Sequence, residues 1–200
     1  QRQMCIRDSL GWELRFEGLP ALQGVFAVYP HTSNWDFVLA MTAKWALGLQ
    51  VSFWGKDTLF RIPMFGRWLR WVGGVPVLRH APQGVVGQMV ARMHQARENA
   101  ELFWLGLSPE GTRRWTPGWR SGFYQVTLGA GVPLGVVSLD YGRKVVDATR
   151  FMTLSGDVQA DFARIAELLA GVQGKNPALA APIQTLPAPA QAATKTELSL

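Results

Sequence analysis

The alternation of short apolar segments with longer amphipathic ones constrains the fold of this chain most strongly. Apolar segments typical of buried strands lie near residues 25–29, 51–54, 75–78, 101–107 and 132–139. Stretches with helical spacing lie between them, near residues 34–48, 57–72 and 84–100. Because strands that alternate with helices favour parallel pairing, the sequence predicts an α/β fold, a single domain with a mostly parallel central sheet flanked by helices.

The ends of the chain differ from this region. Residues 145–151 predict a strand antiparallel to the one before it, and helical spacing returns at residues 158–172. Residues 1–9 show no periodicity and lack the apolar core of a signal peptide, so we expect a disordered leader or a non-native remnant there. Residues 174–200 are rich in Pro, Ala, Gln and Thr, which predicts a disordered tail. The folded domain is therefore expected over residues 10–173.

Composition narrows the range of partners. With 200 residues, 48% of them hydrophobic, the chain can bury one real core. A net charge of +6 favours an anionic partner, such as a membrane surface, a phospholipid or the phosphates of coenzyme A. The only cysteine, Cys5, excludes an intrachain disulfide and fits a reducing compartment. No uninterrupted apolar run approaches the ~18 residues of a membrane-spanning helix, so we expect peripheral attachment to a membrane.

The strongest chemical signal is the hexapeptide His-Thr-Ser-Asn-Trp-Asp at residues 31–36. It follows an apolar strand, and a hydroxyl or amide side chain within it can cap the next helix. If the turn folds back, the Asp36 carboxylate reaches one ring nitrogen of His31, fixes the tautomer and stabilises the imidazolium. The pair would then act as a general base. The alternative is that His31 and Asp36 only cap and hydrogen-bond a turn.

No internal nucleophile, metal site or bound cofactor is indicated. The nearest sequence to a Gly-x-Ser-x-Gly elbow, at residues 106–111, has the wrong spacing. His80 and His94 share no metal-ligand spacing with His31, and a Gly-x4-Gly-Lys phosphate loop does not occur. The simplest chemistry left is attack by a substrate hydroxyl, deprotonated by His31, on an activated acyl group.

A second motif, Pro-Glu-Gly-Thr-Arg at residues 109–113, follows the apolar segment at 101–107. It should lie at the carboxyl end of a strand, where open α/β sheets place ligand sites. Gly111 permits close approach of the backbone, and Arg113 offers a planar fork suited to a phosphate. Glu110 would orient Arg113 or bind a hydroxyl of the acceptor. The alternative is a surface turn that carries a charge pair.

A basic, tryptophan-rich segment lies between these motifs, at residues 55–79. It contains five Lys or Arg residues and a single acid, Asp57. Apolar side chains after Pro63 fall at helical spacing, with Arg67 and Arg70 on another face. A basic amphipathic helix with tryptophans favours an anionic lipid surface. The alternative is a core helix with a solvated basic edge, and no recognised motif supports binding of nucleic acid.

Four blocks follow one another along the chain: His-x4-Asp at 31–36, a basic segment ending at 73–79, Pro-Glu-Gly-Thr-Arg at 109–113 and an apolar run at 132–137. In this order they resemble the glycerolipid acyltransferases of the lysophosphatidic acid acyltransferase family, the 1-acylglycerol-3-phosphate O-acyltransferases, over roughly residues 20–160. The chain is most similar to short members without an N-terminal membrane anchor. The resemblance implies the α/β fold of the glycerol-3-phosphate and lysophosphatidate acyltransferases.

The resemblance also implies an activity and roles for particular residues. A fatty acyl group would pass from acyl-CoA or acyl-ACP, the acyl carrier protein, to a hydroxyl of a lysophospholipid or glycerol phosphate, in phospholipid biosynthesis or remodelling. His31 and Asp36 would be catalytic. The acceptor and its phosphate would be bound by Arg79, Glu110, Gly111, Thr112, Arg113 and Lys56. The enzyme would act peripherally, at the cytoplasmic face of a membrane, with no bound cofactor.

Three residues depart from the family pattern. Ser108 stands where an aromatic residue is usual, Arg114 where a small hydroxyl residue is usual, and Leu78 where an acidic residue is often found. The changes beside the third block leave a different lipid acceptor open. A non-catalytic module that binds anionic lipid is the alternative from another functional class.

Overall fold

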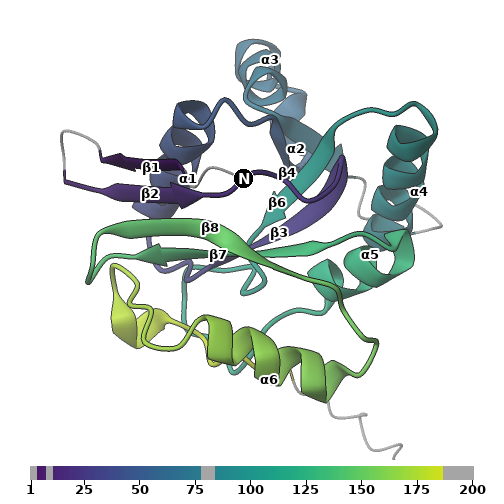
Figure 1. Cartoon of the computed structure of the whole chain (residues 1–200). Coiled ribbons are helices and arrows are strands. Elements are labelled where there is room, and N and C mark those ends of the chain that lie inside the picture. Colours follow the sequence, from purple (N-terminus) through teal and green to yellow (C-terminus); the bar gives the residue numbers. More distant parts are fainter. Residues whose placement is uncertain (1–3, 8–10, 78–83, 187–200) are drawn as a thin grey trace, which may run out of the picture.

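The computed structural model describes residues 4–7, 11–77 and 84–186 (Figure 1). Within these residues, eight strands form one sheet in the order β1-β2-β8-β7-β3-β6-β4-β5. The strands are β1 (Met4–Arg7), β2 (Glu13–Phe16), β3 (Gln23–Tyr29), β4 (Val51–Lys56), β5 (Gly74–Val77), β6 (Phe103–Leu107), β7 (Leu134–Asp140) and β8 (Val145–Met152). The five strands from β7 to β5 pair in parallel, and β8 is antiparallel to β7. The predicted mostly parallel α/β sheet and its antiparallel addition are confirmed.

Helices occupy the connections between strands. Those in the described residues are α1 (Asn34–Ala46), α2 (Asp57–Phe60), α3 (Pro63–Trp71), α4 (Gly84–Glu98), α5 (Gly122–Ala130), α6 (Val158–Leu168) and a 3₁₀ turn, η1 (Pro177–Leu179). None of the helices described is long and apolar enough to cross a membrane.

Two helical segments differ from expectation. The single helix expected at 57–72 is divided into α2 and α3, because Pro63 begins α3 and disfavours helical backbone at Ile62 before it. Helix α5 was not anticipated from the sequence. Its buried residues fall on one side of the helix, but its exposed positions include Leu128 and Gly129, so the sequence shows little contrast between an apolar and a polar face.

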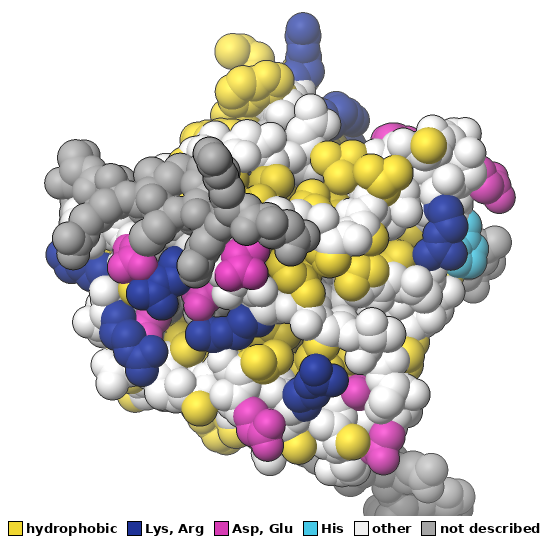
Figure 2. Space-filling view, in the orientation of Figure 1, with side chains coloured by type: hydrophobic (Ala, Val, Ile, Leu, Met, Phe, Trp, Pro, Cys, Tyr) yellow, Lys and Arg dark blue, Asp and Glu magenta, His cyan; other side chains and the backbone are white. Residues whose placement is uncertain are grey.

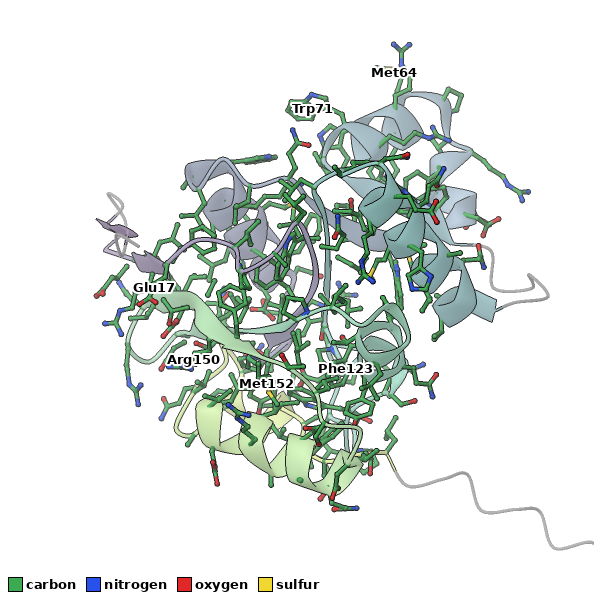
Figure 3. The ribbon with its side chains drawn as sticks, turned by 45° about the vertical axis from the view of Figure 1, so that its right-hand side comes forward. Glu17, Met64, Trp71, Phe123, Arg150 and Met152 are labelled. Atoms are coloured by element: carbon green, nitrogen blue, oxygen red, sulfur yellow. The ribbon has the colours of Figure 1, made fainter. Side chains whose placement is uncertain are left out.

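The sheet is covered on both faces, which explains why β3 is apolar at consecutive positions. Val25, Ala27 and Tyr29 pack on one face with α4, α5 and α6, whereas Phe26 packs on the other. Figure 1 shows α4 and α5 together beside the sheet, with α6 below it. In Figure 3, Phe123 lies in the layer between the sheet and α6. Helix α1 faces the opposite side of the sheet, where its inner residues meet the smaller core cluster.

Both ends of the folded domain extend beyond the expected bounds of 10–173. Residues 4–7, expected to belong to a disordered or non-native leader, form β1, which pairs with β2. Residues 174–186, also expected to be disordered, pack on the domain: Ala181 is buried, and the Trp119 N–H donates to the Gln184 carbonyl at 2.7 Å. These bonds use the backbone, which composition does not reveal. The rest of the expected tail, 187–200, lies outside the described residues.

Candidate active site

A cavity of about 710 Å³ lies between α1 and the sheet. Helix α1 does not fill it, because Asp36 is the only buried residue of that helix. Apolar side chains from α1 and the facing strands form most of the wall, among them Phe26, Val28, Phe37, Met41, Phe53 and Leu139. His31 and Arg113 also line the cavity. Its volume falls in the range of about 300–1,000 Å³ typical of ligand sites, so an apolar space adjoins the polar motifs.

Local backbone chemistry places the loop between β3 and α1. Ser33 is the N-cap of α1, and its Oγ accepts a hydrogen bond from the Trp35 N–H at 3.2 Å. In return, Asp36 Oδ2 accepts from the Ser33 N–H at 2.7 Å, which completes a capping box. The cap expected within the hexapeptide is therefore Ser33. The same capping box turns the Asp36 carboxylate back toward His31.

The Asp36 carboxylate is surrounded by donors. Oδ2 also accepts from the Thr32 N–H at 2.6 Å and lies 3.4 Å from His31 Nδ1, while Oδ1 accepts from the Tyr141 hydroxyl at 2.8 Å. Burial alone would raise the pKa of Asp36, but the hydrogen bonds from His31, Tyr141 and the backbone outweigh it and hold the pKa below its ordinary value. Asp36 is therefore an ionised partner of the imidazole and a helix cap at once.

The two ring nitrogens of His31 have different surroundings. Because Nδ1 lies beside Asp36, Nε2 is the nitrogen left to accept a proton. The ring lines the cavity and its side chain is 27% exposed. A base needs one nitrogen held by a carboxylate and the other within reach of substrate. The structure thus brings together the predicted pair in an arrangement that suits general-base chemistry.

Glu110 is a brace inside the protein, which differs from the two roles expected from the sequence. Its side chain is 1% exposed and accepts from two backbone groups: Oε2 from the His31 N–H, and Oε1 from the Ala181 N–H at 2.9 Å. Burial raises the pKa of Glu110, although both backbone bonds oppose the shift. Among the described residues, Glu110 forms no hydrogen bond or ion pair with Arg113, and it does not line the cavity. It connects the two motif loops instead.

The rest of the Pro-Glu-Gly-Thr-Arg loop reaches the cavity. Gly111 has a φ of +64°, and a Cβ there would lie 2.6 Å from Arg120 Nε, so this position requires glycine. Thr112 lines the cavity, and its Oγ1 accepts from the Arg114 N–H at 3.2 Å. Arg113 donates to the Asn34 side chain at the start of α1. The loop thus carries the Arg113 guanidinium to the same end of the cavity as His31.

Two predicted site residues are not located by the structure. Arg79 lies outside the described residues. Lys56 ends β4, the strand next to β6, and its side chain is not described. Among the described residues, no group of three His, Cys, Asp or Glu side chains could hold a metal ion.

Three residues of the site were missed by sequence reasoning. Tyr141 holds Asp36, as described above, and it follows β7, the parallel neighbour of β3. Asn176 contacts the loop between β3 and α1: its Nδ2 donates to the Thr32 carbonyl at 2.9 Å. Lys44 lines the cavity and donates to two carbonyl oxygens, and burial lowers its pKa. Of the three, only Tyr141 could have been proposed from the sequence, because it follows a predicted strand and the carboxyl ends of such strands carry ligand sites.

A parallel α/β sheet with a His–Asp pair beside an apolar cavity has the layout of an enzyme active site. A family model described as Acyltransferase matches residues 13–139, more than half of the chain. The chain therefore belongs to the acyltransferase family. No curated protein and no solved structure gives a significant match. The matched region includes both motif loops, whereas Tyr141 and Asn176 follow it.

Proposed function

We propose that this acyltransferase moves a fatty acyl group from an acyl thioester, acyl-CoA or acyl-ACP, to a hydroxyl of a lysophospholipid. One observation carries the proposal: His31, backed by the ionised Asp36, lines the same cavity as a broad apolar wall and the Arg113 guanidinium. A substrate with an acyl chain, a reactive carbonyl and an anionic head group matches these three features. The specific lysophosphatidate-like acceptor rests on the resemblance of the four blocks.

In the proposed reaction, His31 Nε2 takes the proton of the acceptor hydroxyl while the hydroxyl oxygen attacks the thioester carbonyl carbon. Asp36 stabilises the imidazolium that forms, because its carboxylate lies beside Nδ1. Collapse of the tetrahedral intermediate breaks the carbon–sulfur bond. The imidazolium then returns its proton to the leaving thiolate, so the products are an ester and a free thiol, and the base is regenerated.

Binding of the two substrates follows from the charge and shape of the site. The apolar wall between α1 and the sheet takes the acyl chain. Arg113, which reaches the mouth of the cavity from the loop after β6, binds the phosphate of the acceptor as a planar fork. Arg79 and Lys56 remain proposed phosphate contacts from the resemblance alone. Glu110 acts through His31 and does not contact the acceptor.

A different lipid acceptor is the second candidate, and one observation favours it. Arg114 also lines the cavity, so two guanidinium groups stand at positions where the family pattern has one. A second cation would suit a head group that carries more than one anionic or hydrogen-bonding group.

The experiment measures release of free thiol from a long-chain acyl-CoA with four acceptors: lysophosphatidate, glycerol 3-phosphate, lysophosphatidylglycerol and monoacylglycerol. We expect the highest rate with a lysophospholipid. His31→Ala should lower the rate by at least ~10²-fold, whereas His94→Ala, on the exposed face of α4, should leave it unchanged. Arg113→Gln should raise the KM of phosphorylated acceptors and spare monoacylglycerol.

Each result has a clear alternative. Thiol release that needs no acceptor would identify a thioesterase, and no release with any acceptor would favour the lipid-binding module. A folded His31→Ala variant that works at the wild-type rate would reject the proposed base. Equal penalties of Arg113→Gln with and without the acceptor phosphate would reject the phosphate contact.

A further inference from the structure

Helices α1 and α3 expose large apolar side chains on one continuous surface, named here the docking surface. Its members are Trp35, Val38 and Trp45 of α1 and Met64, Trp68 and Trp71 of α3. The ring centres of Trp45 and Trp71 lie 6.4 Å apart, so the two helices share the surface. Met64 is 87% exposed and Trp71 is 76% exposed, and Figure 3 shows both pointing away from the molecule. Contiguous exposure of this kind marks an interaction site.

The docking surface is bordered by positive charge. Arg61, Arg67 and Arg70 are exposed on and beside α3, and Asp57 is the only acid in α2 and α3. Asp57 pairs with Arg61 at 3.0 Å, whereas Arg67 has no ion pair with any residue that the structure describes. Figure 2 shows Lys or Arg side chains beside hydrophobic ones at the top of the molecule, where Figure 1 places α3. An apolar patch with a cationic border complements an anionic lipid surface.

The same helix that forms part of the docking surface also forms the wall of the cavity. Six residues of α1 line the cavity at helical spacing: Asp36, Phe37, Ala40, Met41, Ala43 and Lys44. Trp35, Val38 and Trp45 lie on the other side of this helix and are exposed. Only the width of one helix, about 10 Å, therefore separates the docking surface from the cavity.

We propose that the docking surface binds the anionic surface of a lipid bilayer, with α1 as the partition between the outer lipid layer and the cavity. A second copy of the chain fits the surface poorly, because a symmetric dimer would bring the arginines of each copy against those of the other. This binding does not depend on acyl transfer. It adds to the proposed function the surface on which the enzyme would meet its lipid substrate.

Cosedimentation with vesicles tests the proposal without any measurement of turnover. The full chain is mixed with vesicles of phosphatidylcholine alone, or with about one third phosphatidylglycerol, at about 0.05 M and about 0.5 M salt. We expect binding to the anionic vesicles that weakens at high salt. Arg67→Glu should lower the partition coefficient by about 25-fold, since each charge near the surface contributes about fivefold. The matched control is Arg164→Glu, the same charge change on the exposed face of α6.

An apolar variant separates insertion from simple charge attraction. Trp71→Ser should reduce binding to anionic vesicles by at least about tenfold, and it should leave the hydrolysis or transfer of a soluble short-chain thioester unchanged. Absence of binding to anionic vesicles at low salt would overturn the proposal. So would equal losses from Arg67→Glu and Arg164→Glu, or a stable dimer in sedimentation equilibrium that Trp71→Ser dissociates.

Discussion

The brace role of Glu110 can be tested with the isosteric change Glu110→Gln. The carboxylate accepts from two backbone N–H groups, those of His31 and Ala181. A glutamine amide has one acceptor oxygen, so one of these N–H groups would instead face an NH₂ group. A buried donor left without a partner costs about 1–3 kcal/mol. Relief of the buried charge, whose desolvation raises the pKa of Glu110, offsets part of this cost.

The expected result is a loss of both stability and rate. A destabilisation of about 1–3 kcal/mol lowers Tm by about 2–12 °C in a protein of this size. A displaced His31 backbone moves the base, and a misplacement of about 1 Å costs up to about 10²-fold in kcat. The acceptor KM should change little, because Glu110 does not line the cavity.

Thermal unfolding and steady-state kinetics of the purified variant measure these effects. Glu101→Gln is the matched control, because Glu101 is exposed and its ion pair with Arg92 contributes at most about 1 kcal/mol. If Glu110→Gln kept the wild-type Tm and raised only the acceptor KM, Glu110 would be a substrate contact and the brace role would be wrong.

Three further predictions concern the shell around His31. Asp36→Asn should lower kcat by at least ~10²-fold. Folding lowers the pKa of Asp36 from 3.8. The stability that the Asp36 carboxylate contributes is therefore complete above pH 3.8, and it is lost as the pH falls through the lowered pKa of the folded protein. The difference in Tm between Asp36→Asn and the wild type should therefore shrink in strong acid. Tyr141→Phe removes a hydrogen bond to Asp36, so it should raise the pKa of Asp36 and strengthen the attraction between the Asp36 carboxylate and the His31 imidazolium. The acidic limb of the kcat/KM profile should then move to higher pH, which a pH–rate series will show. Asn176→Ala should lower kcat more than Gln184→Ala, a change in the same segment that removes a bond to Pro117.

The sequence predicts the central part of the fold well because burial on both faces imposes strong local patterns. Strands such as β3 are apolar at successive positions, and the connecting helices show amphipathic spacing. The pattern fails where one of these conditions is absent. Helix α5 has few polar residues on its exposed side, and strand β2, which lies between β1 and β8, has only four residues, two of them charged. Neither gives a periodic signal that differs from a loop.

The site could be predicted only as far as its local motifs extend. His31 and Asp36 are five residues apart, and a helix cap is enough to bring them together. The contacts made by Tyr141 and Asn176 cross 105 and 144 residues of sequence, so no spacing rule reveals them. The role of Glu110 was missed for a different reason. A carboxylate in a turn that resembles a family motif suggests a contact with substrate, but the partners of Glu110 are backbone N–H groups, which are identical for nearly every residue.

Asp36 contributes both to the folding of the loop between β3 and α1 and to the proposed chemistry of His31. The carboxylate that holds His31 Nδ1 also completes the capping box that starts α1, and this helix forms one wall of the cavity. Formation of the first turn of α1 therefore assembles the proposed base and the cavity wall together. A loss of activity on substitution of Asp36 mixes the two effects, whereas Tyr141 contacts only the carboxylate oxygen that the cap does not use. Tyr141→Phe is thus the substitution that separates the electrostatics of the pair from the stability of the helix.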